Sequence, residues 1–415
     1  MLRFVLHELP DIFGEVDRAA LAATAEPRLD DHLPPDFAMH LTDQPLLNAL
    51  RRHPLRMSVT EWQASSSSSS PLLHVPYVPA FSSRIAEFAR QLGWPEGSPF
   101  AGMPSSTSHA QRMAAVNHSL STIAAWRHPR PSEPFLFIMG HWGTAYAFTD
   151  PFIRALWQPH HHWFLATVET GSAHYGMRGK SGMHNLGERR VVIPYRAHYL
   201  ASESAFAPDG SPQSKPKREG VMFHGGLRRA DGGIRPGREE LAQLARETRL
   251  PFSLGNSTIG HVHTIANYSS DARHANNVQH KTMSAMRTAL LCLVPAGDTI
   301  TSRRLFDALA CGCVPVLMRK QAYMHSSLPF TSIINWKRIA LSIEWPTTRV
   351  REVARRLENV AANASLLNAL REAGQTTYRS YLSVGRNPAG VSDALLSEMA
   401  SRSPFRGGGA AGSTG

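Results

Sequence analysis

Residues 296–302, with the sequence AGDTITS, combine a glycine and several hydroxyl side chains between two apolar runs. Gly297 allows another group to approach the backbone closely, and Thr299 and Ser302 offer hydroxyl donors. Arg304 follows two positions later and can hold a phosphate through two parallel N–H donors. These residue types, in this order, predict a site for an anionic ligand.

Asp307 lies three residues after Arg304, on the same side of a helix, where its carboxylate can accept hydrogen bonds from ribose hydroxyls. The alternative is that Arg304 and Asp307 pair with each other on a solvated helix face. The segment contains neither GxxxxGK[ST] nor GxGxxG, so it is not a P-loop or a dinucleotide fingerprint. A diphosphate held by arginine and hydroxyl groups without either motif is typical of a nucleotide-sugar site.

The flanking sequence predicts the elements that position these side chains. Residues 289–295 and 313–318 are apolar runs typical of buried strands. Between them we expect a helix with Ser302 as its N-cap and its end at Gly312. Its apolar side chains share one face: Leu305, Phe306 and Leu309. Strand, helix and strand within about 30 residues form a right-handed βαβ unit.

This βαβ unit places residues 296–302 where its first strand ends and its helix begins. Open α/β sheets bind ligands at that edge. The free N–H groups of a helix N-terminus, together with the helix dipole, favour an anion there.

The rest of the chain alternates in the same way, which predicts an α/β fold of two Rossmann-like, doubly wound domains. We expect further strands at 3–10, 72–79, 134–140, 162–169, 188–200 and 220–226. We expect further helices at 82–94, 111–127, 237–249, 281–290 and 347–378.

A change in composition near residue 200 predicts the domain organisation. We expect an N-terminal domain over 1–200, a Pro-rich linker over 201–219 and a C-terminal domain over 220–400 that contains the predicted nucleotide-sugar site. The Ser-rich stretch 64–71 is typical of a flexible loop, and 401–415 of a disordered tail.

The length and the net charge of the chain limit the kinds of protein that it can be. The chain has 415 residues, too many for one ordinary core. Lysine and arginine total 44 against 32 acidic residues, and the formal net charge of +12 favours anionic partners. The basic residues are scattered and no aromatic-studded RNA-binding signature accompanies them, so nucleic-acid binding rests on net charge alone.

Three cysteines, Cys292, Cys311 and Cys313, lie in or beside the βαβ unit. Their odd number and close spacing are not those of a disulfide framework, and no CxxC pair is present. Their apolar neighbours predict buried thiols rather than a metal or redox site.

The stretch LLCLVPAGDTITSRRLFDALACGCVPVLM resembles the signature of the exostosin-like glycosyltransferases, glycosyltransferase family 47. The family pattern there is an apolar strand ending in Cys-Leu, then Pro-x-Gly-Asp-Thr, a serine, Arg-Leu-Phe-Asp-Ala and Gly-Cys-Val-Pro-Val. The segments LPFTSIINWKRIALSIEW, VMFHGG, GREEL, RRVVIPY and FVLHELP resemble further family segments, so the likeness spans roughly residues 3–350.

The resemblance implies a GT-B fold, in which two Rossmann-like domains face each other across a cleft. It also implies an inverting transfer from a UDP-sugar with no obligatory metal and no other cofactor. It implies that five residues bind most of the donor: Gly297, Thr299, Ser302, Arg304 and Asp307. A second anion contact would come from the 225–238 loop, with Arg238 as the best match and Arg235 as the alternate.

The N-terminal half departs from the family pattern. Where the family has Asp-His before an apolar strand and Asp-Arg-Gly after it, this chain has SEPFLFIMGHWG, with His141 and Trp142 in place of the acid and the arginine. Trp142 would either stack on an acceptor sugar or belong to the core. The histidines at 160–162 predict a loop rather than a metal site, because they cannot all point one way on a strand.

The base that deprotonates the acceptor hydroxyl is not identified by a motif. Glu169 is our first candidate, because it follows a predicted strand of the N-terminal domain (1–200), which the resemblance implies would bind the acceptor. His141 is the second candidate.

We therefore predict an enzyme that transfers a sugar from a UDP-sugar to an oligosaccharide, polysaccharide or glycoprotein, without a nucleic-acid partner. The alternative is a non-catalytic exostosin-like protein that supports another glycosyltransferase in a complex. The resemblance implies the Golgi membrane or lumen, yet no apolar run is long enough to span a membrane and no signal-peptide pattern begins the chain. We therefore expect either a truncated N-terminus or a protein that is cytosolic or otherwise retained.

Overall fold

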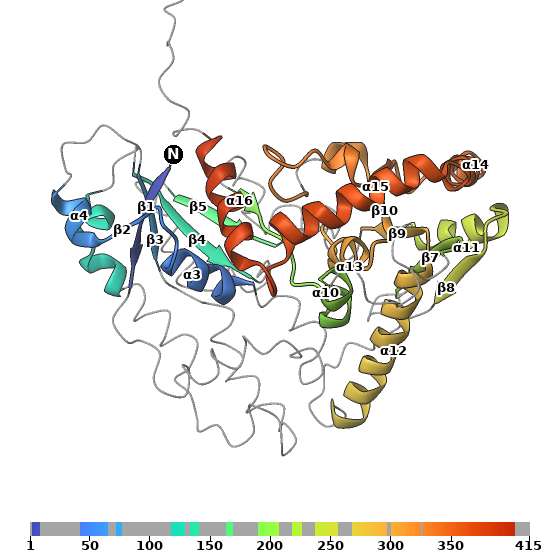
Figure 1. The fold of residues 1–415 in the computed structure, drawn as a ribbon, viewed down its shortest axis with the longest axis horizontal. Helices are drawn as coiled ribbons and strands as arrows, with labels where there is room; N and C mark the ends of the chain where they lie inside the picture. Colours follow the sequence, from blue (N-terminus) through green and yellow to red (C-terminus); the bar gives the residue numbers. More distant parts are fainter. Residues whose placement is uncertain are drawn as a thin grey trace, which may run out of the picture.

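The computed structural model describes residues 2–8, 42–64, 72–76, 118–128, 133–140, 163–168, 190–206, 218–225, 237–255, 268–296, 300–324 and 327–402. Within these ranges the chain forms two parallel β-sheets, each accompanied by helices (Figure 1). The helix predicted at 82–94, most of the Ser-rich loop 64–71 and residues 403–415 of the expected tail lie outside the described residues.

The N-terminal sheet has the order β2-β1-β3-β4-β5-β6, and all its neighbouring strands are parallel. Its strands are β1 (Arg3–His7), β2 (Arg56–Met57), β3 (Leu72–Pro76), β4 (Phe135–Met139), β5 (Trp163–Thr167) and β6 (Arg190–Val192). The helices whose bounds lie within the described residues of this part are α3 (Asp43–Arg51), α4 (Val59–Ala64) and α7 (Ala124–Arg127). Both β3 and β5 are buried at every residue, which explains their almost continuous apolar sequences.

The C-terminal sheet has the order β11-β10-β9-β7-β8 and is also parallel. Its strands are β7 (Val221–His224), β8 (Phe252–Gly255), β9 (Leu291–Pro295), β10 (Val314–Met318) and β11 (Leu341–Ile343). The accompanying helices are α11 (Arg238–Glu247), α12 (Tyr268–Thr288), α13 (Arg303–Cys311), α14 (Val350–Ala362) and α15 (Ala364–Thr377). The predicted helix over 347–378 is thus two helices, which meet where the Asn363 side chain accepts a hydrogen bond from the N–H of Leu366.

The predicted βαβ unit is present as β9, α13 and β10. The face of α13 that we expected to pack on the sheet is buried at Leu305, Phe306 and Leu309. Gly312 ends the helix in the left-handed conformation, with φ of 70°, which a glycine adopts without steric cost. Ser302 occupies the N-cap position in extended backbone, although its side chain makes no capping hydrogen bond.

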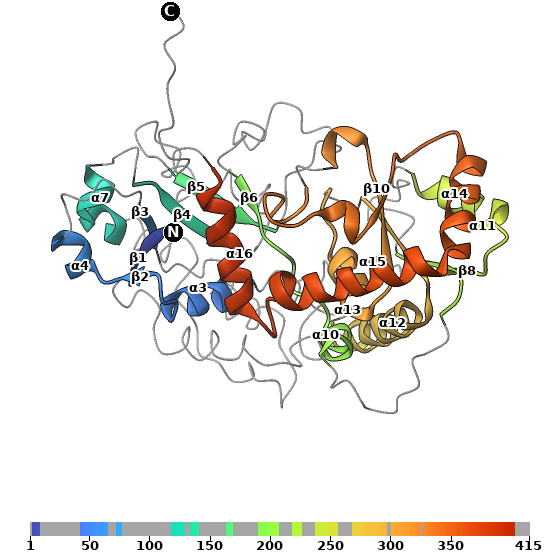
Figure 2. The same ribbon diagram turned by 45° about the horizontal axis from the view of Figure 1, so that its top comes forward.

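Helices near the centre of the chain and at its end join the two sheets. The helix α10 (Tyr199–Ala205), in the region where we expected the linker to begin, packs against α13. The helix α16 (Pro388–Ala400), whose residues we expected in the C-terminal domain, packs against α3 beside the N-terminal sheet (Figure 2). The prediction of an α/β, GT-B fold with two Rossmann-like sheets is confirmed.

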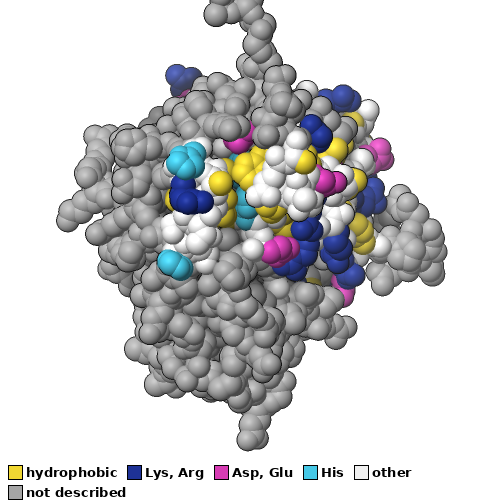
Figure 3. All heavy atoms as spheres, turned by 90° about the vertical axis from the view of Figure 1, so that its left-hand side faces the viewer, with side chains coloured by type: hydrophobic (Ala, Val, Ile, Leu, Met, Phe, Trp, Pro, Cys, Tyr) yellow, Lys and Arg dark blue, Asp and Glu magenta, His cyan; other side chains and the backbone are white. Residues whose placement is uncertain are grey.

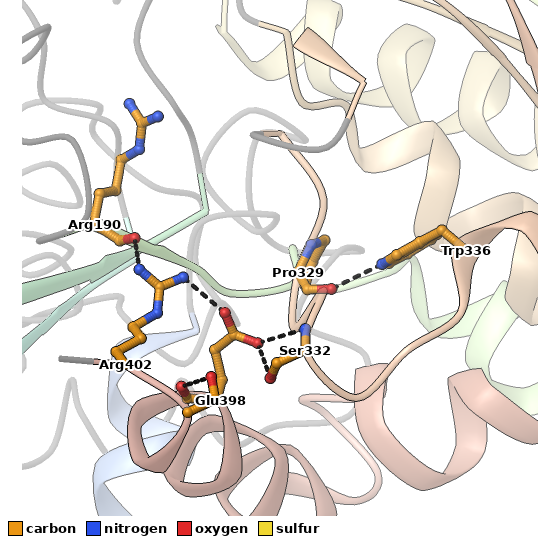
Figure 4. Close-up of polar contacts among 7 residues, drawn as sticks. Arg190, Pro329, Ser332, Trp336, Glu398 and Arg402 are labelled. Atoms are coloured by element: carbon orange, nitrogen blue, oxygen red, sulfur yellow. Dashed lines mark hydrogen bonds and ion pairs between the residues drawn. The ribbon is translucent and has the colours of Figure 1, made fainter. Parts of the chain in front are cut away.

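A buried carboxylate fixes α16 at the junction of the two sheets (Figure 4). Glu398 is 3% exposed and accepts hydrogen bonds from the backbone and hydroxyl of Ser332 and from Arg402. The second guanidinium nitrogen of Arg402 donates to the carbonyl of Arg190 in β6, at 2.8 Å. One carboxylate therefore connects the segment between β10 and β11 of the C-terminal sheet, through Arg402, to an edge strand of the N-terminal sheet.

The prediction that all three cysteines are free thiols is wrong for two of them. Cys292 in β9 and Cys313 immediately before β10 form a disulfide, and Cys311 is a buried free thiol. The strand register explains the pair, because Cys292 lies opposite Pro315 and Cys313 is two positions away on the same face of the adjacent strand. Burial, followed by the charge of Asp307, raises the pKa of the Cys311 thiol to about 12.

Among the described residues, α12 and the other helices are all too short or too polar to cross a membrane.

Candidate functional site

Two arginines each make a cation–π contact with the same aromatic ring at the carboxyl edge of the C-terminal sheet. The guanidinium carbon of Arg238 lies 4.6 Å from the centroid of Phe223, and that of Arg304 lies 5.2 Å from it. Phe223 belongs to β7, whereas the arginines are the first residue of α11 and the second of α13. The sequence predicted each arginine as an anion ligand, and the fold brings both to this edge.

The backbone of β7 holds the Arg304 side chain. Its Nε donates to the carbonyl of His224 at 2.9 Å. A Cβ atom on Gly225 would lie 2.5 Å from Nη2 of Arg304 and 2.6 Å from Cζ of Phe223, which real side chains do not tolerate. The glycine after β7 is therefore required so that the guanidinium can cross the end of the strand.

Arg238 is held in place by the end of β9 and is only 1% exposed. Its Nη2 donates at 3.1 Å to the carbonyl of Ala296, the first residue of the predicted anion loop 296–302. The preceding Gly237 adopts φ of 77°, and its carbonyl accepts a hydrogen bond from the indole of Trp345 at 2.8 Å. This turn directs the start of α11 toward the start of α13.

Asp307 contacts the start of α10 and the first residue of α13. It is buried, accepts a hydrogen bond from the backbone N–H of His198 at 2.7 Å and lies 3.7 Å from the Arg303 guanidinium. These contacts connect α13 to the N-terminus of α10. The described contacts give the carboxylate a structural role, and its predicted contact with a ribose stays a prediction.

Of the other predicted site residues, the structure describes Ser302. Ser302 is 8% exposed and directly precedes α13. Several candidates lie outside the described residues: Gly297, Thr299, Arg235, Glu169, His141, Trp142 and the histidines at 160–162.

His224 was not singled out from the sequence, although a histidine that ends a parallel strand is a usable signal. Its ring lies between two hydroxyls, with Nε2 at 2.9 Å from Oγ of Ser253 and Nδ1 at 3.4 Å from Oγ1 of Thr282. Burial, and then the positive charge of Arg304, lower the pKa of His224.

A second polar cluster lies in the N-terminal sheet. His7 Nε2 contacts His74 Nδ1 at 2.8 Å, and His74 Nε2 lies 3.5 Å from the carboxylate of Glu133. His7 also lines a cavity of about 220 Å³ beside the start of α4. Figure 3 shows the α4 side of the molecule, where histidine and arginine side chains lie beside apolar ones. The sequence did not predict this cluster, because both histidines lie within predicted strands, at 3–10 and 72–79, that are far apart along the chain.

The arginine pair is suited to an anion with more than one charge. Each guanidinium gains a cation–π contact with the same ring, which holds two positive groups near one point. The N-terminus of α13 adds backbone N–H groups and a favourable dipole at the same edge.

Residues 152–360, about half of the chain, match the family model of the exostosin GT47 domain. The chain belongs to this family. The matched range contains Phe223, Arg238 and Arg304, so the arginine pair lies within the family domain.

Among curated proteins, the chain is 31% identical to Exostosin-1 of Drosophila melanogaster over 115 residues, which are 27% of this chain and 13% of that protein. It is 36% identical over 59 residues to the probable arabinosyltransferase ARAD1 of Arabidopsis thaliana, covering 14% of this chain and 12% of that protein. The matches thus span about an eighth of the length of these relatives.

Among solved structures, the chain is similar to Anabaena HepE in complex with UDP and glucose, with a TM-score of 0.38 and 8% identity over 96% of this chain and 100% of that one. It is also similar to WaaG, a glycosyltransferase involved in lipopolysaccharide biosynthesis, with a TM-score of 0.36 and 11% identity over 95% and 99% of the two chains. Both TM-scores are low, so the family of the chain rests on its match to the family model and not on these two structures.

Proposed function

We propose that this member of the exostosin GT47 family transfers a sugar from a UDP-sugar to a glycan or glycoprotein acceptor with inversion. The observation that carries the proposal is that Arg238 and Arg304 both contact the ring of Phe223, at the edge where parallel sheets bind ligands. A UDP diphosphate has the charge that two guanidinium groups and a helix N-terminus favour.

In the proposed reaction the acceptor hydroxyl oxygen attacks the anomeric carbon of the donor sugar, and its proton passes to a base. The bond from that carbon to the diphosphate breaks, and its electron pair leaves with the diphosphate. A single displacement of this kind inverts the anomeric centre. Arg238 and Arg304 would stabilise the negative charge that develops on the departing diphosphate.

Other parts of the proposed site rest on the family resemblance. Gly297, Thr299 and Arg235 stay in the proposed donor site, and Ser302 borders it from the start of α13. Glu169 and then His141 remain the proposed bases, and independence from a metal remains a prediction.

We also propose a Golgi location, in keeping with the family. The disulfide between Cys292 and Cys313 supports it, because disulfides persist in oxidising compartments and are rare in the cytosol.

UDP binding tests the donor site directly. Isothermal calorimetry should detect UDP binding to the wild type, and Arg304→Ala should weaken it by about 10- to 100-fold, the effect of losing a charge-assisted hydrogen bond. Arg355→Ala, at an exposed arginine of α14, is the matched control and should bind UDP like the wild type. Equal UDP affinity in Arg304→Ala and the wild type would contradict the site.

Turnover separates an enzyme from a binding partner. A panel of UDP-sugars, each incubated with glycan acceptors, should release UDP with one donor in preference to the rest. UDP binding without release for any pair would favour the non-catalytic alternative, a protein that supports another glycosyltransferase.

A further inference from the structure

We propose that His224 couples the uptake of a proton to the binding of the donor diphosphate at Arg304. This inference rests on the proposed function, because it describes the regulation of that same donor site. His224 lies at the end of β7, and its own carbonyl holds the Arg304 side chain at 2.9 Å.

The ring of His224 is held by two neighbouring elements. Ser253 of β8 contacts Nε2 at 2.9 Å, and Thr282 of α12 contacts Nδ1 at 3.4 Å. A Cβ atom on Gly255 would lie 2.6 Å from Cδ2 of the ring, so the imidazole lies directly over the backbone of β8. These contacts hold the ring at the end of β7, the strand whose last carbonyl accepts the hydrogen bond from Arg304.

The hydrogen bonds around the ring can satisfy both of its protonation states. The Thr282 hydroxyl donates to the carbonyl of Val278 at 2.9 Å, so its oxygen is left to accept from Nδ1–H of His224. In the neutral ring, Nε2 then accepts from the Ser253 hydroxyl. When the ring is protonated, that hydroxyl needs only to rotate in order to accept from Nε2–H.

Charge and burial therefore decide the protonation state. Ser253 and Thr282 are uncharged, and the described charged group that acts on the ring is Arg304 of α13. Burial and this guanidinium together lower the pKa of His224 and keep the ring neutral near pH 7.

A diphosphate bound at Arg304 would cancel the guanidinium charge and add negative charge near the ring. The pKa of His224 would then rise, and the complex would take up a proton near pH 6.5. By linkage, a ligand that favours the protonated ring is itself bound more tightly when the ring is protonated. The affinity for UDP-glucose, whose phosphates keep their charge in this range, should therefore increase as the pH falls, by roughly 3- to 10-fold between about pH 7.5 and 5.5, with tenfold per pH unit as the limit for one proton.

Calorimetry in buffers of different ionisation enthalpy measures the proton uptake. We would titrate UDP into the wild type, His224→Gln and His280→Gln at pH 6.5; His280 is an exposed histidine of α12 and serves as the matched control. The terminal phosphate of UDP titrates in this range, but it does so equally for all three proteins. UDP-glucose is a second probe, because both of its phosphates are diesters that keep their charge.

The wild type and His280→Gln should take up a proton on binding, and His224→Gln should bind UDP without this uptake. Ser253→Ala provides a second variant, at an exposed position, in case His224→Gln does not fold. It should shrink the uptake, because a hydrogen bond to the charged ring is worth more than one to the neutral ring.

The possible failures are distinguishable. UDP-glucose binding with the same proton uptake in the wild type and His224→Gln, or with none in the wild type, would overturn this inference alone. A wild type that binds neither UDP nor UDP-glucose would overturn the proposed function and this inference with it.

Discussion

Acidification should destabilise the protein through two buried histidines of the N-terminal sheet. His7 is 5% exposed and His74 is fully buried, and their rings stack with centroids 5.1 Å apart. Burial, and then the neighbouring His74, lower the pKa of His7 to about 3. Burial lowers the pKa of His74 to about 4 and outweighs the carboxylate of Glu133, 3.5 Å away.

The sign and size of the effect follow from the protons bound in each state. In the unfolded chain both histidines titrate near pH 6.5. Between that pH and about 4 the unfolded state binds more protons than the native state, so the free energy of unfolding decreases as the pH falls. Each histidine contributes a slope of up to about 1.4 kcal/mol per pH unit. The two histidines together should therefore lower the free energy of unfolding by roughly 4 to 5 kcal/mol between about pH 6.5 and 4.5. This is a large part of the stability of a typical domain.

Urea denaturation at a series of pH values measures this loss. His7→Gln retains an N–H that can donate to His74 and removes one titrating group, so the slope below pH 6.5 should fall by about half. His280→Gln, at an exposed position, should leave the slope unchanged. An unfolding free energy that stays constant from pH 7 to 5, or an equal slope in the wild type and His7→Gln, would refute the reasoning.

Two further predictions concern the donor site and the junction of the sheets. Gly225→Ala should displace the Arg304 side chain, because the new Cβ would lie 2.5 Å from Nη2, and UDP titration should show about a tenfold loss of affinity or more. Gly385→Ala would place its Cβ at an ordinary 3.6 Å from the nearest side chain and should bind UDP normally; equal affinity in both variants would contradict the geometry. Glu398→Gln should lower the free energy of unfolding by about 2 to 4 kcal/mol, because burial alone would raise the pKa of this carboxyl and charge-assisted hydrogen bonds lower it. Urea denaturation should show almost no change for Glu352→Gln at an exposed site of α14, and a Glu398→Gln variant of equal stability would count against the junction.

Local sequence alone determined the elements that present the donor site. The apolar residues of α13 recur at helical spacing, and Gly312 supplies the left-handed residue at which the helix ends. These features depend on neighbours within about one helical turn, so a linear sequence contains them completely. The same holds for buried strands such as β9 and β10, whose continuous apolar runs require cover on both faces of a parallel sheet.

Only the tertiary structure revealed the contacts that form the site and those that join the two sheets. Arg304 reaches the carbonyl of His224 across 80 positions, and His7 meets His74 across 67. The disulfide depends on β9 and β10 being neighbours in a particular register, and the docking of α16 on α3 depends on how the chain returns across the junction. Strand order and register set these distances. Strand order and register result from the packing of the whole core, which no short stretch of sequence specifies by itself.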